Sequence, residues 1–174
     1  MQDDYDLKKL RDKPKRKNSR AKGSRFELKL VKDLNEHFNT KDFARTPGSG
    51  AFASTHKLPE ELQIYGDLIT PTKFRFVIEA KSGYNGCDLQ GALSPKNEIY
   101  KFIEQASKDG RAAKKPWILL FKQDRRGILG IISKENPLYK ALPEDTQRIE
   151  LIDGSIMVLF EELLKLPVGL FFNE

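Results

Sequence analysis

The sequence of 174 residues lacks most of what a disulfide-bonded, zinc-binding or membrane-spanning protein requires. Its single cysteine, Cys87, excludes an internal disulfide framework and a cysteine-rich zinc site. The two histidines, His37 and His56, have no zinc-type spacing. No apolar run approaches the ~20 residues of a membrane span, and the N-terminus has no secretory apolar core. We therefore expect a cytoplasmic protein, in which any bound metal is a hard, oxygen-ligated ion such as Mg²⁺ or Mn²⁺.

Positive charge is concentrated at one end of the chain. The net charge is +6, and residues 1–25 hold ten Lys or Arg against four Asp, whereas the cationic and acidic residues of 26–174 balance. We predict a disordered basic arm over residues 1–22 and a single domain over residues 23–174. Such an arm is typical of attraction to a phosphate backbone, and Arg20 and Lys22 are candidate DNA contacts. A merely solubilising tail is the alternative.

A helix is predicted directly after this arm. Its apolar residues recur at helical spacing: Phe26, Leu30, Val31, Leu34 and Phe38. Glu27 borders this stripe and could lean toward a sheet. It could equally form a capping box with Ser24 at the start of the helix. Both interpretations of Glu27 stay open at this point.

The most informative pattern is Asp67 followed by the run Ile78-Glu79-Ala80-Lys81. We predict a strand, a turn centred on Lys73 and a second, central strand. Antiparallel pairing would set Asp67 opposite Glu79, with their Cβ atoms roughly 4.5–5.5 Å apart. Lys81 would share the face of Glu79, because side chains alternate along a strand, and Ala80 would point the other way. Two carboxylates and an ammonium at one point are suited to metal-dependent phosphodiester cleavage. A solvated cross-strand neighbour is the alternative for so short a pattern.

A loop with phosphate-binding character precedes this pair of strands. Arg45 could reach a phosphate, and Gly48-Ser49-Gly50 allows the backbone to approach a ligand closely. Many surface turns have the same composition, so the loop alone specifies little.

The remainder predicts alternating helix and strand. A helix from an N-cap at Ser94 to a stop at Gly110 carries Gln105, a candidate DNA contact, on its flank. Strands are expected at 117–121, 128–132 and 147–152, and a short strand or closing helix at 156–166. Phe171-Phe172 should be core or a subunit contact. The pattern is an α/β fold with a central mixed sheet flanked by helices.

The order of these motifs resembles the PD-(D/E)XK nuclease superfamily and, within it, the archaeal-type Holliday-junction resolvases that also occur in phages. The stretches that carry the resemblance are residues 23–27, Arg45-Thr46-Pro47-Gly48-Ser49-Gly50, Tyr65-Gly66-Asp67-Leu68-Ile69 and Ile78-Glu79-Ala80-Lys81. One departure is Gly66, where many members have proline. The resemblance covers about residues 22–132 and leaves the 51–65 insertion and the C-terminal extension unmatched.

The resemblance implies a restriction-endonuclease-like fold and a role for each matched residue. Asp67 and Glu79, with the backbone carbonyl of Ala80, would bind Mg²⁺ or Mn²⁺, and Glu27 would complete the acidic cluster. Lys81 would orient the attacking water and offset charge in the transition state. Ser49 would contact the scissile phosphate. Arg25 and Arg45 would grip the DNA backbone.

Two symmetric cuts in a four-way junction require a C₂ homodimer with two active sites. The expected partner is therefore branched double-stranded DNA in recombination or repair, with neither a small-molecule cofactor nor a membrane involved. The rival predictions are another nuclease of this fold, acting on a flap, a mismatch or a restriction site, and a non-catalytic DNA-binding module. An RNA-binding accessory protein would explain the arm alone.

Overall fold

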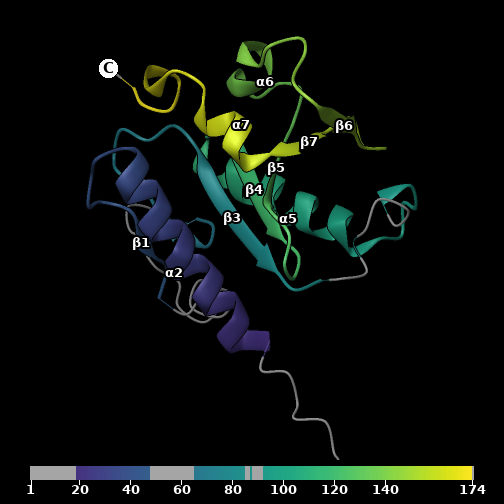
Figure 1. Ribbon diagram of the computed structural model, residues 1–174, viewed down its shortest axis with the longest axis horizontal. Helices are drawn as coiled ribbons and strands as arrows, with labels where there is room; N and C mark the ends of the chain where they lie inside the picture. The colour runs from purple at the N-terminus through teal and green to yellow at the C-terminus, as the bar shows by residue number, and fades with distance from the viewer. Residues whose placement is uncertain (1–18, 48–64, 85–86, 88–91, 174) are drawn as a thin grey trace, which may run out of the picture.

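A computed structural model describes residues 19–47, 65–84, 87 and 92–173 of the chain. Its centre is a mixed five-stranded sheet in the order β3-β4-β5-β7-β6, as Figure 1 shows. The strands are β3 (Val77–Ser82), β4 (Trp117–Lys122), β5 (Ile128–Ile132), β6 (Arg148–Glu150) and β7 (Ile156–Leu159). β3 and β4 are parallel, and all other neighbours are antiparallel. The predicted α/β class with a central mixed sheet flanked by helices is confirmed.

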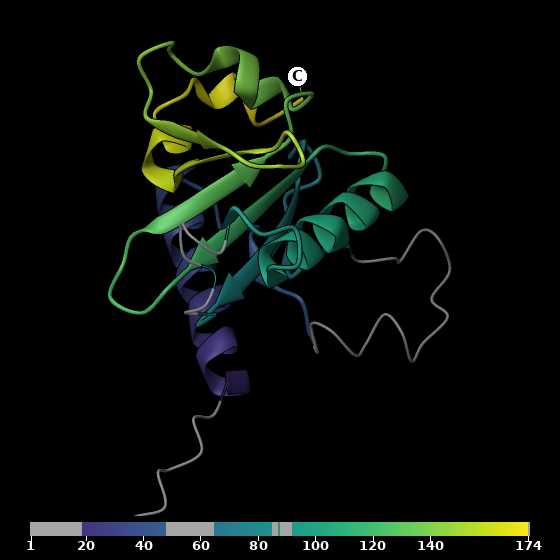
Figure 2. The same ribbon diagram turned by 90° about the vertical axis from the view of Figure 1, so that its right-hand side faces the viewer.

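Helices cover both faces of this sheet (Figure 2). One face packs against α2 (Ser19–His37), α6 (Pro137–Ala141) and α7 (Phe160–Leu164), and its core includes Leu30, Ile78, Ile118 and Leu163. The other face packs against α5 (Glu98–Ala113) through residues such as Ile103, Leu119 and Phe121. The crossover helix α5 connects the parallel pair β3–β4, as parallel strands require. Within the described part of the chain, no helix is long and apolar enough to cross a membrane.

The predicted hairpin before Glu79 is wrong in its pairing. The short strand β2 (Leu68–Ile69) pairs with β1 (Ala44–Arg45), so that Ile69 lies opposite Ala44 and not opposite Val77. β3 is the last strand of the five-stranded order and not a central one. It is nevertheless buried along Val77–Ala80, because α2, α5 and β2 all contact it. An apolar, buried sequence alone could not distinguish a central strand from an edge strand that other elements cover.

Both long helices begin at residues that differ from the predicted ones. α2 starts at Ser19, so Ser24 lies inside the helix and the capping-box interpretation of Glu27 is wrong. The boundary predicted at residue 22 therefore falls within α2, and residues 1–18 lie outside the described residues. The N-cap of α5 is Asn97, whose side chain accepts from the Ile99 backbone amide, and not Ser94.

The end of α5 also differs from its prediction. The helix continues through Gly110 to Ala113, and Lys114 caps it in a left-handed conformation. Gly110 is buried, and a Cβ there would lie 2.9 Å from the Lys115 carbonyl oxygen. Close packing, and not helix termination, explains this glycine.

The C-terminal segment closes the domain next to the segment that leads into β3, where Phe74 and Phe172 form an isolated antiparallel bridge. The short 3₁₀-helix η2 (Val168–Leu170) precedes Phe171, whose carbonyl accepts from the Arg75 amide at 2.9 Å. Phe171 is buried, and Phe171 and Phe172 both make ring contacts with Phe38 and Phe74. Of the two predictions for Phe171-Phe172, the structure supports the core.

Candidate active site

The candidate site lies where β3 meets the segment before β2. Ile78 and Ala80 belong to the core on the α2 side of the sheet, and Glu79 is paired in register with Leu119, a core residue on the α5 side. Because side chains alternate along a strand, Glu79 and Lys81 share the α5 face, as predicted. The Lys81 ammonium lies 5.9 Å from the centre of the Phe102 ring on α5.

Hydrogen bonds to Ile78 and Thr46 hold the turn that carries Asp67 against β3. The Asp67 backbone amide donates to the Ile78 carbonyl at 2.9 Å, and its own carbonyl accepts from the Thr46 amide at 3.0 Å. The Thr46 hydroxyl donates to the Gly66 carbonyl at 3.2 Å. Gly66 has a φ of +77°, and a Cβ there would overlap the Ile78 carbonyl and lie 2.9 Å from Val77 Cγ1. The glycine before Asp67 is therefore required by close backbone approach as well as by its positive φ.

The side chains of Asp67, Glu79 and Lys81 form one group. Lys81 Nζ donates to Glu79 Oε1 and lies 3.4 Å from Asp67 Oδ2. The Ala80 backbone amide donates to the same Asp67 oxygen at 2.9 Å. Glu79 is 1% exposed, and its Oε2 is buried with no hydrogen-bond partner among the described residues. The structure thus brings the predicted trio together, although through a different backbone pairing.

The electrostatics of the group favour an additional positive charge. Burial, followed by repulsion from Asp67, raises the pKa of Glu79 to about 8, and the nearby Lys81 only partly opposes this. The pKa of Lys81 is also raised, because attraction to Glu79 and Asp67 outweighs the opposing effect of its burial. Two carboxylates with one ammonium leave the group short of one cation when both acids are ionised.

These residues fit a divalent cation in donor chemistry and in charge. The unpartnered Glu79 Oε2 and the adjacent Asp67 carboxylate offer the oxygen ligands that Mg²⁺ and Mn²⁺ prefer. Among the described residues there is no cluster of three or more His, Cys, Asp or Glu side chains able to hold a metal. Any ion held here by the described chain would therefore take its remaining ligands from backbone oxygen or water.

Glu27 is not brought into this group. It is buried on α2 and forms an ion pair with Arg45, a residue of β1. To act as a metal ligand, Glu27 would have to share or release Arg45, and Arg45 would likewise have to leave Glu27 to contact a phosphate. The pairing satisfies a buried charge, which a carboxylate in such a position requires.

The other predicted DNA contacts are dispersed. Arg20 and Arg25 are exposed on the first two turns of α2. Lys22, in the same part of the helix, pairs with Asp124 in the turn between β4 and β5. Gln105 is exposed on α5. Ser49 and its two flanking glycines lie outside the described residues.

Two residues near Asp67 were not singled out from the sequence. Thr46 is buried and hydrogen-bonds the backbone on both sides of the Gly66–Asp67 peptide. Asp109 on α5 has a raised pKa because of its burial, while a hydrogen bond from the Gly66 backbone opposes the shift and the Asp67 charge adds to it. A signal for Thr46 existed in its place within the Arg45–Gly50 motif. For Asp109, the only signal in the sequence was its position beside the buried stripe of α5.

A family comparison decides the chemistry that this geometry supports. Residues 18–160 match a family described as "Phage putative PDDEXK endonuclease", and the match includes Asp67, Glu79 and Lys81. The chain belongs to this family. It is thus a nuclease by family, and the resemblance to the PD-(D/E)XK superfamily is confirmed.

Two individual proteins are similar to this member of the family. Protein D14 of Escherichia phage T5 is 28% identical over 160 residues, which cover 88% of this chain and 89% of that protein. The solved structure of Hjc, a Holliday junction resolvase from Archaeoglobus fulgidus, is similar at 15% sequence identity with a TM-score of 0.38. The similarity covers 81% of this chain and 91% of Hjc.

Proposed function

We propose that this nuclease is a Mg²⁺-dependent endodeoxyribonuclease that resolves four-way DNA junctions by paired, symmetric nicks. The observation that carries the hydrolytic chemistry is the buried, unpartnered Glu79 Oε2 beside Asp67 and Lys81. Leaving a buried carboxylate oxygen without a partner is costly, and a cation-binding role supplies a reason for that cost.

Each residue of the site has a role in this proposal. Asp67 and Glu79 hold the ion, with the backbone carbonyl of Ala80 as a further ligand. A divalent cation there would lower the pKa of a water molecule and withdraw charge from the phosphoryl oxygens. Lys81, whose pKa is raised by both carboxylates, stays protonated. It therefore stabilises the negative charge of the transition state and does not act as a free base.

The choice of a four-way junction rests on the sequence stretches that resemble archaeal-type resolvases. Paired cuts in such a substrate require two active sites, and hence a homodimer. Recognition by shape and phosphate contacts is expected, with Arg20, Lys22 and Arg25 as contributors. Cytoplasmic action during recombination or repair is part of the same proposal. A flap, a mismatch or a restriction site would use the same metal group, so these remain the rival substrates.

Cleavage of a synthetic four-way junction and of its matched linear duplex tests the proposal. Wild type should make paired nicks in the junction alone, with Mg²⁺ but not with a chelator. Asp67→Asn should bind the junction without cutting it, whereas Asp145→Asn, a change at an exposed acid in the loop before β6, should behave like wild type. Equal cutting of both substrates would contradict junction selectivity. Binding without cleavage by wild type in Mg²⁺ and in Mn²⁺ would favour a non-catalytic DNA-binding module.

Metal binding has a readout of its own. Mg²⁺ or Mn²⁺ should raise the unfolding temperature of wild type and of Asp145→Asn, because an ion that binds only the folded state stabilises it. Asp67→Asn should lose most of this rise. An equal rise in all three proteins would place the ion elsewhere.

A further inference from the structure

The turn between β4 and β5 lies at the end of the sheet where β3 carries Lys81. Lys81 is in register with Phe121, and Ser82 with Lys122, the last residue of β4. The Gly83 amide then donates to the Lys122 carbonyl at 2.9 Å. The turn therefore begins two residues beyond Phe121, the residue in register with Lys81. Arg125 is four residues beyond Phe121, at most about 13 Å further along an extended chain.

Arg125 has an unusual backbone conformation for its position. Its φ is +59°, and its side chain is exposed. Glycine or asparagine adopts this left-handed conformation at little cost, whereas a long side chain there is disfavoured. Since an exposed arginine adds little to a core, the fold gains nothing evident from it. A role for its charge outside the fold would explain why arginine stands at this position.

The neighbouring charges make the turn basic. Lys22 of α2 pairs with Asp124, so the one acid of the turn is compensated from the adjacent helix. A Cβ at Gly83 would lie 3.1 Å from Lys22 Nζ, so this ammonium also lies over the end of β3. Lys122 alternates onto the same side of the sheet as Ile118, a residue of the α2-side core. Three cations, Lys22, Lys122 and Arg125, thus lie at this end of the sheet with Asp124 among them.

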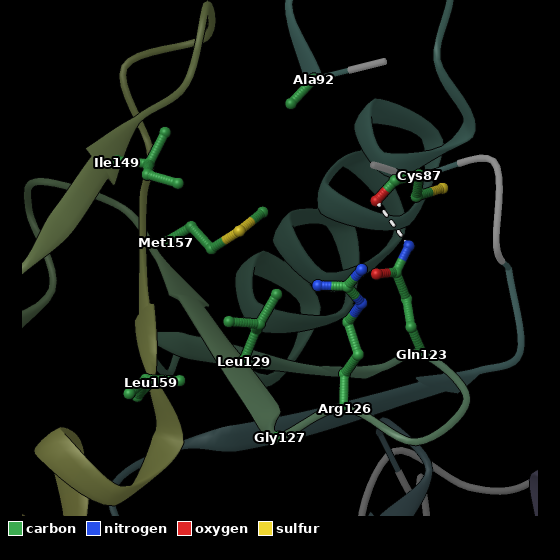
Figure 3. A pocket seen from close by; sticks show the side chains of 9 residues that line it. All are labelled: Cys87, Ala92, Gln123, Arg126, Gly127, Leu129, Ile149, Met157 and Leu159. Carbon is green, nitrogen blue, oxygen red and sulfur yellow. Dashed lines mark hydrogen bonds between the residues drawn. The ribbon is translucent and has the colours of Figure 1, made fainter. Parts of the chain in front are cut away.

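Arg126 is directed elsewhere. Its side chain lines a cavity of about 570 Å³, and Figure 3 shows it beside Gln123 and Leu129. Gln123 donates to the Cys87 carbonyl at 3.0 Å across the same region. Arg126 therefore belongs to the lining of this cavity, and only Arg125 is grouped with Lys22 and Lys122 at the end of the sheet.

We propose that Arg125, with Lys22 and Lys122, holds the phosphodiester backbone of a duplex DNA arm that passes the end of the sheet next to the active site. The inference rests on the proposed nuclease function and adds a contact surface to it. Because the turn directly follows the residues in register with Lys81 and Ser82, the phosphates that it contacts should lie close to the cut. The contact is with phosphates, so it should be independent of sequence and sensitive to salt.

The test uses a matched pair of substitutions in the full chain. Arg125→Gly removes the cation and relieves the positive φ. Lys114→Gly makes the same change at the exposed cap of α5, where φ is 53°, at the opposite end of β4. Both variants should unfold at or above the temperature of wild type. Equilibrium binding to a synthetic four-way junction without divalent metal is then measured at several salt concentrations, and so is cleavage with Mg²⁺.

Arg125→Gly should weaken binding about two- to fivefold near physiological salt and reduce the slope of log K against log salt by about 0.9. Lys114→Gly should change neither quantity. Equal effects of the two substitutions, or none, would overturn the inference, and so would a wild-type protein that binds no DNA. If wild type binds but does not cleave, the proposed nuclease function fails while the binding comparison still decides the role of Arg125.

Discussion

Two buried acidic regions of this domain differ in how their charge is compensated. On the α2 side, the buried carboxylate of Glu27 forms an ion pair with Arg45. On the α5 side, Asp67 and Glu79 share one cation, Lys81, and one oxygen of Glu79 has no partner among the described residues. The first arrangement satisfies a structural charge. The second is short of positive charge when both acids are ionised, which is the condition that favours binding a divalent ion.

The comparison also separates residues that the sequence pattern treats alike. Glu27, Asp67 and Glu79 are all buried acids in the region of the family match. Only the last two contact the same ammonium. We therefore expect substitutions at the two regions to differ in kind, with effects on chemistry at one and on stability at the other.

The largest difference is expected between Glu79→Gln and Glu27→Gln. Glu79→Gln should lower the cleavage rate by about a thousandfold or more, since under the proposed mechanism it removes a metal ligand and with it several kcal/mol of transition-state stabilisation. Glu27→Gln should reduce the rate less than tenfold. It should lower the free energy of unfolding by about 1–2 kcal/mol, because Arg45 loses its carboxylate. Single-turnover cleavage and urea unfolding measure the two quantities.

Glu27 remains a metal-ligand prediction from the sequence, and the same pair tests it. If Glu27→Gln abolishes cleavage and the Mg²⁺-induced rise in unfolding temperature as completely as Glu79→Gln does, the Glu27–Arg45 pair must open when the ion binds. The contrast between the two regions would then be a property of the metal-free protein alone.

The second prediction concerns pH. The pKa of Glu79 is about 8 in the folded protein against 4.5 ordinarily, so the folded state holds its proton more tightly than the unfolded state does. This contribution to stability is present below pH 4.5 and is lost as the pH rises through 8. Between pH 5 and 8 it gives a slope of up to about −1.4 kcal/mol per pH unit. Chelator-treated wild type should follow this slope, and Glu79→Gln should flatten it.

Saturating divalent metal should remove this trend in wild type, because the proton on Glu79 is then absent from the folded and the unfolded state alike. An ion that replaces the proton on Glu79 binds more tightly as the pH rises toward 8. The stabilisation by Mg²⁺ should therefore grow from pH 6 to pH 8. Equal slopes in metal-free wild type and Glu79→Gln would show that Glu79 does not control the pH dependence.

How far the sequence predicts such a site depends on whether its signal is local. Alternation along a strand correctly placed Glu79 and Lys81 on one face, because this property needs only the residues themselves. The partner of the strand before β3 was predicted wrongly. The turn residues Pro71-Thr72-Lys73 favour a hairpin, but β2 pairs with β1, and tertiary packing decided the outcome.

Long-range partners left little trace in the sequence. The ion pair of Glu27 with Arg45 joins residues 18 positions apart, and no periodicity connects them. The start of α2 was placed too late because the apolar stripe begins at Phe26, whereas the helix extends through polar residues back to Ser19. Gly66 was noted only as a departure from the proline of many relatives. Its positive φ and its approach to Ile78 became apparent only in three dimensions.

Gly66 provides the third prediction, which sharpens the comparison by moving Asp67 alone. Gly66→Ala places a Cβ against the Ile78 carbonyl, so we expect a loss of roughly 2–3 kcal/mol in the free energy of unfolding. Cleavage should fall with it, because Asp67 is the next residue. Gly154→Ala is the matched control, since its φ is +81° and no atom lies within 4 Å of the added Cβ. It should cost about 1 kcal/mol and leave cleavage unchanged. Equal costs for both would mean that φ alone, and not crowding at β3, requires Gly66.

The smallest effect is expected at Thr46, which lies between the two regions. It follows Arg45 in the chain, and its hydroxyl donates to the Gly66 carbonyl at 3.2 Å. Thr46→Val keeps the shape but loses this hydrogen bond, worth about 1 kcal/mol, and should lower kcat a few-fold with little change in KM. Thr46→Ser keeps the hydroxyl and should retain the wild-type kcat, although loss of a buried methyl group lowers its stability too. If the two variants have the same kcat, the hydroxyl does not position Asp67, and the backbone bond from Thr46 to Asp67 is sufficient to hold the acid in place.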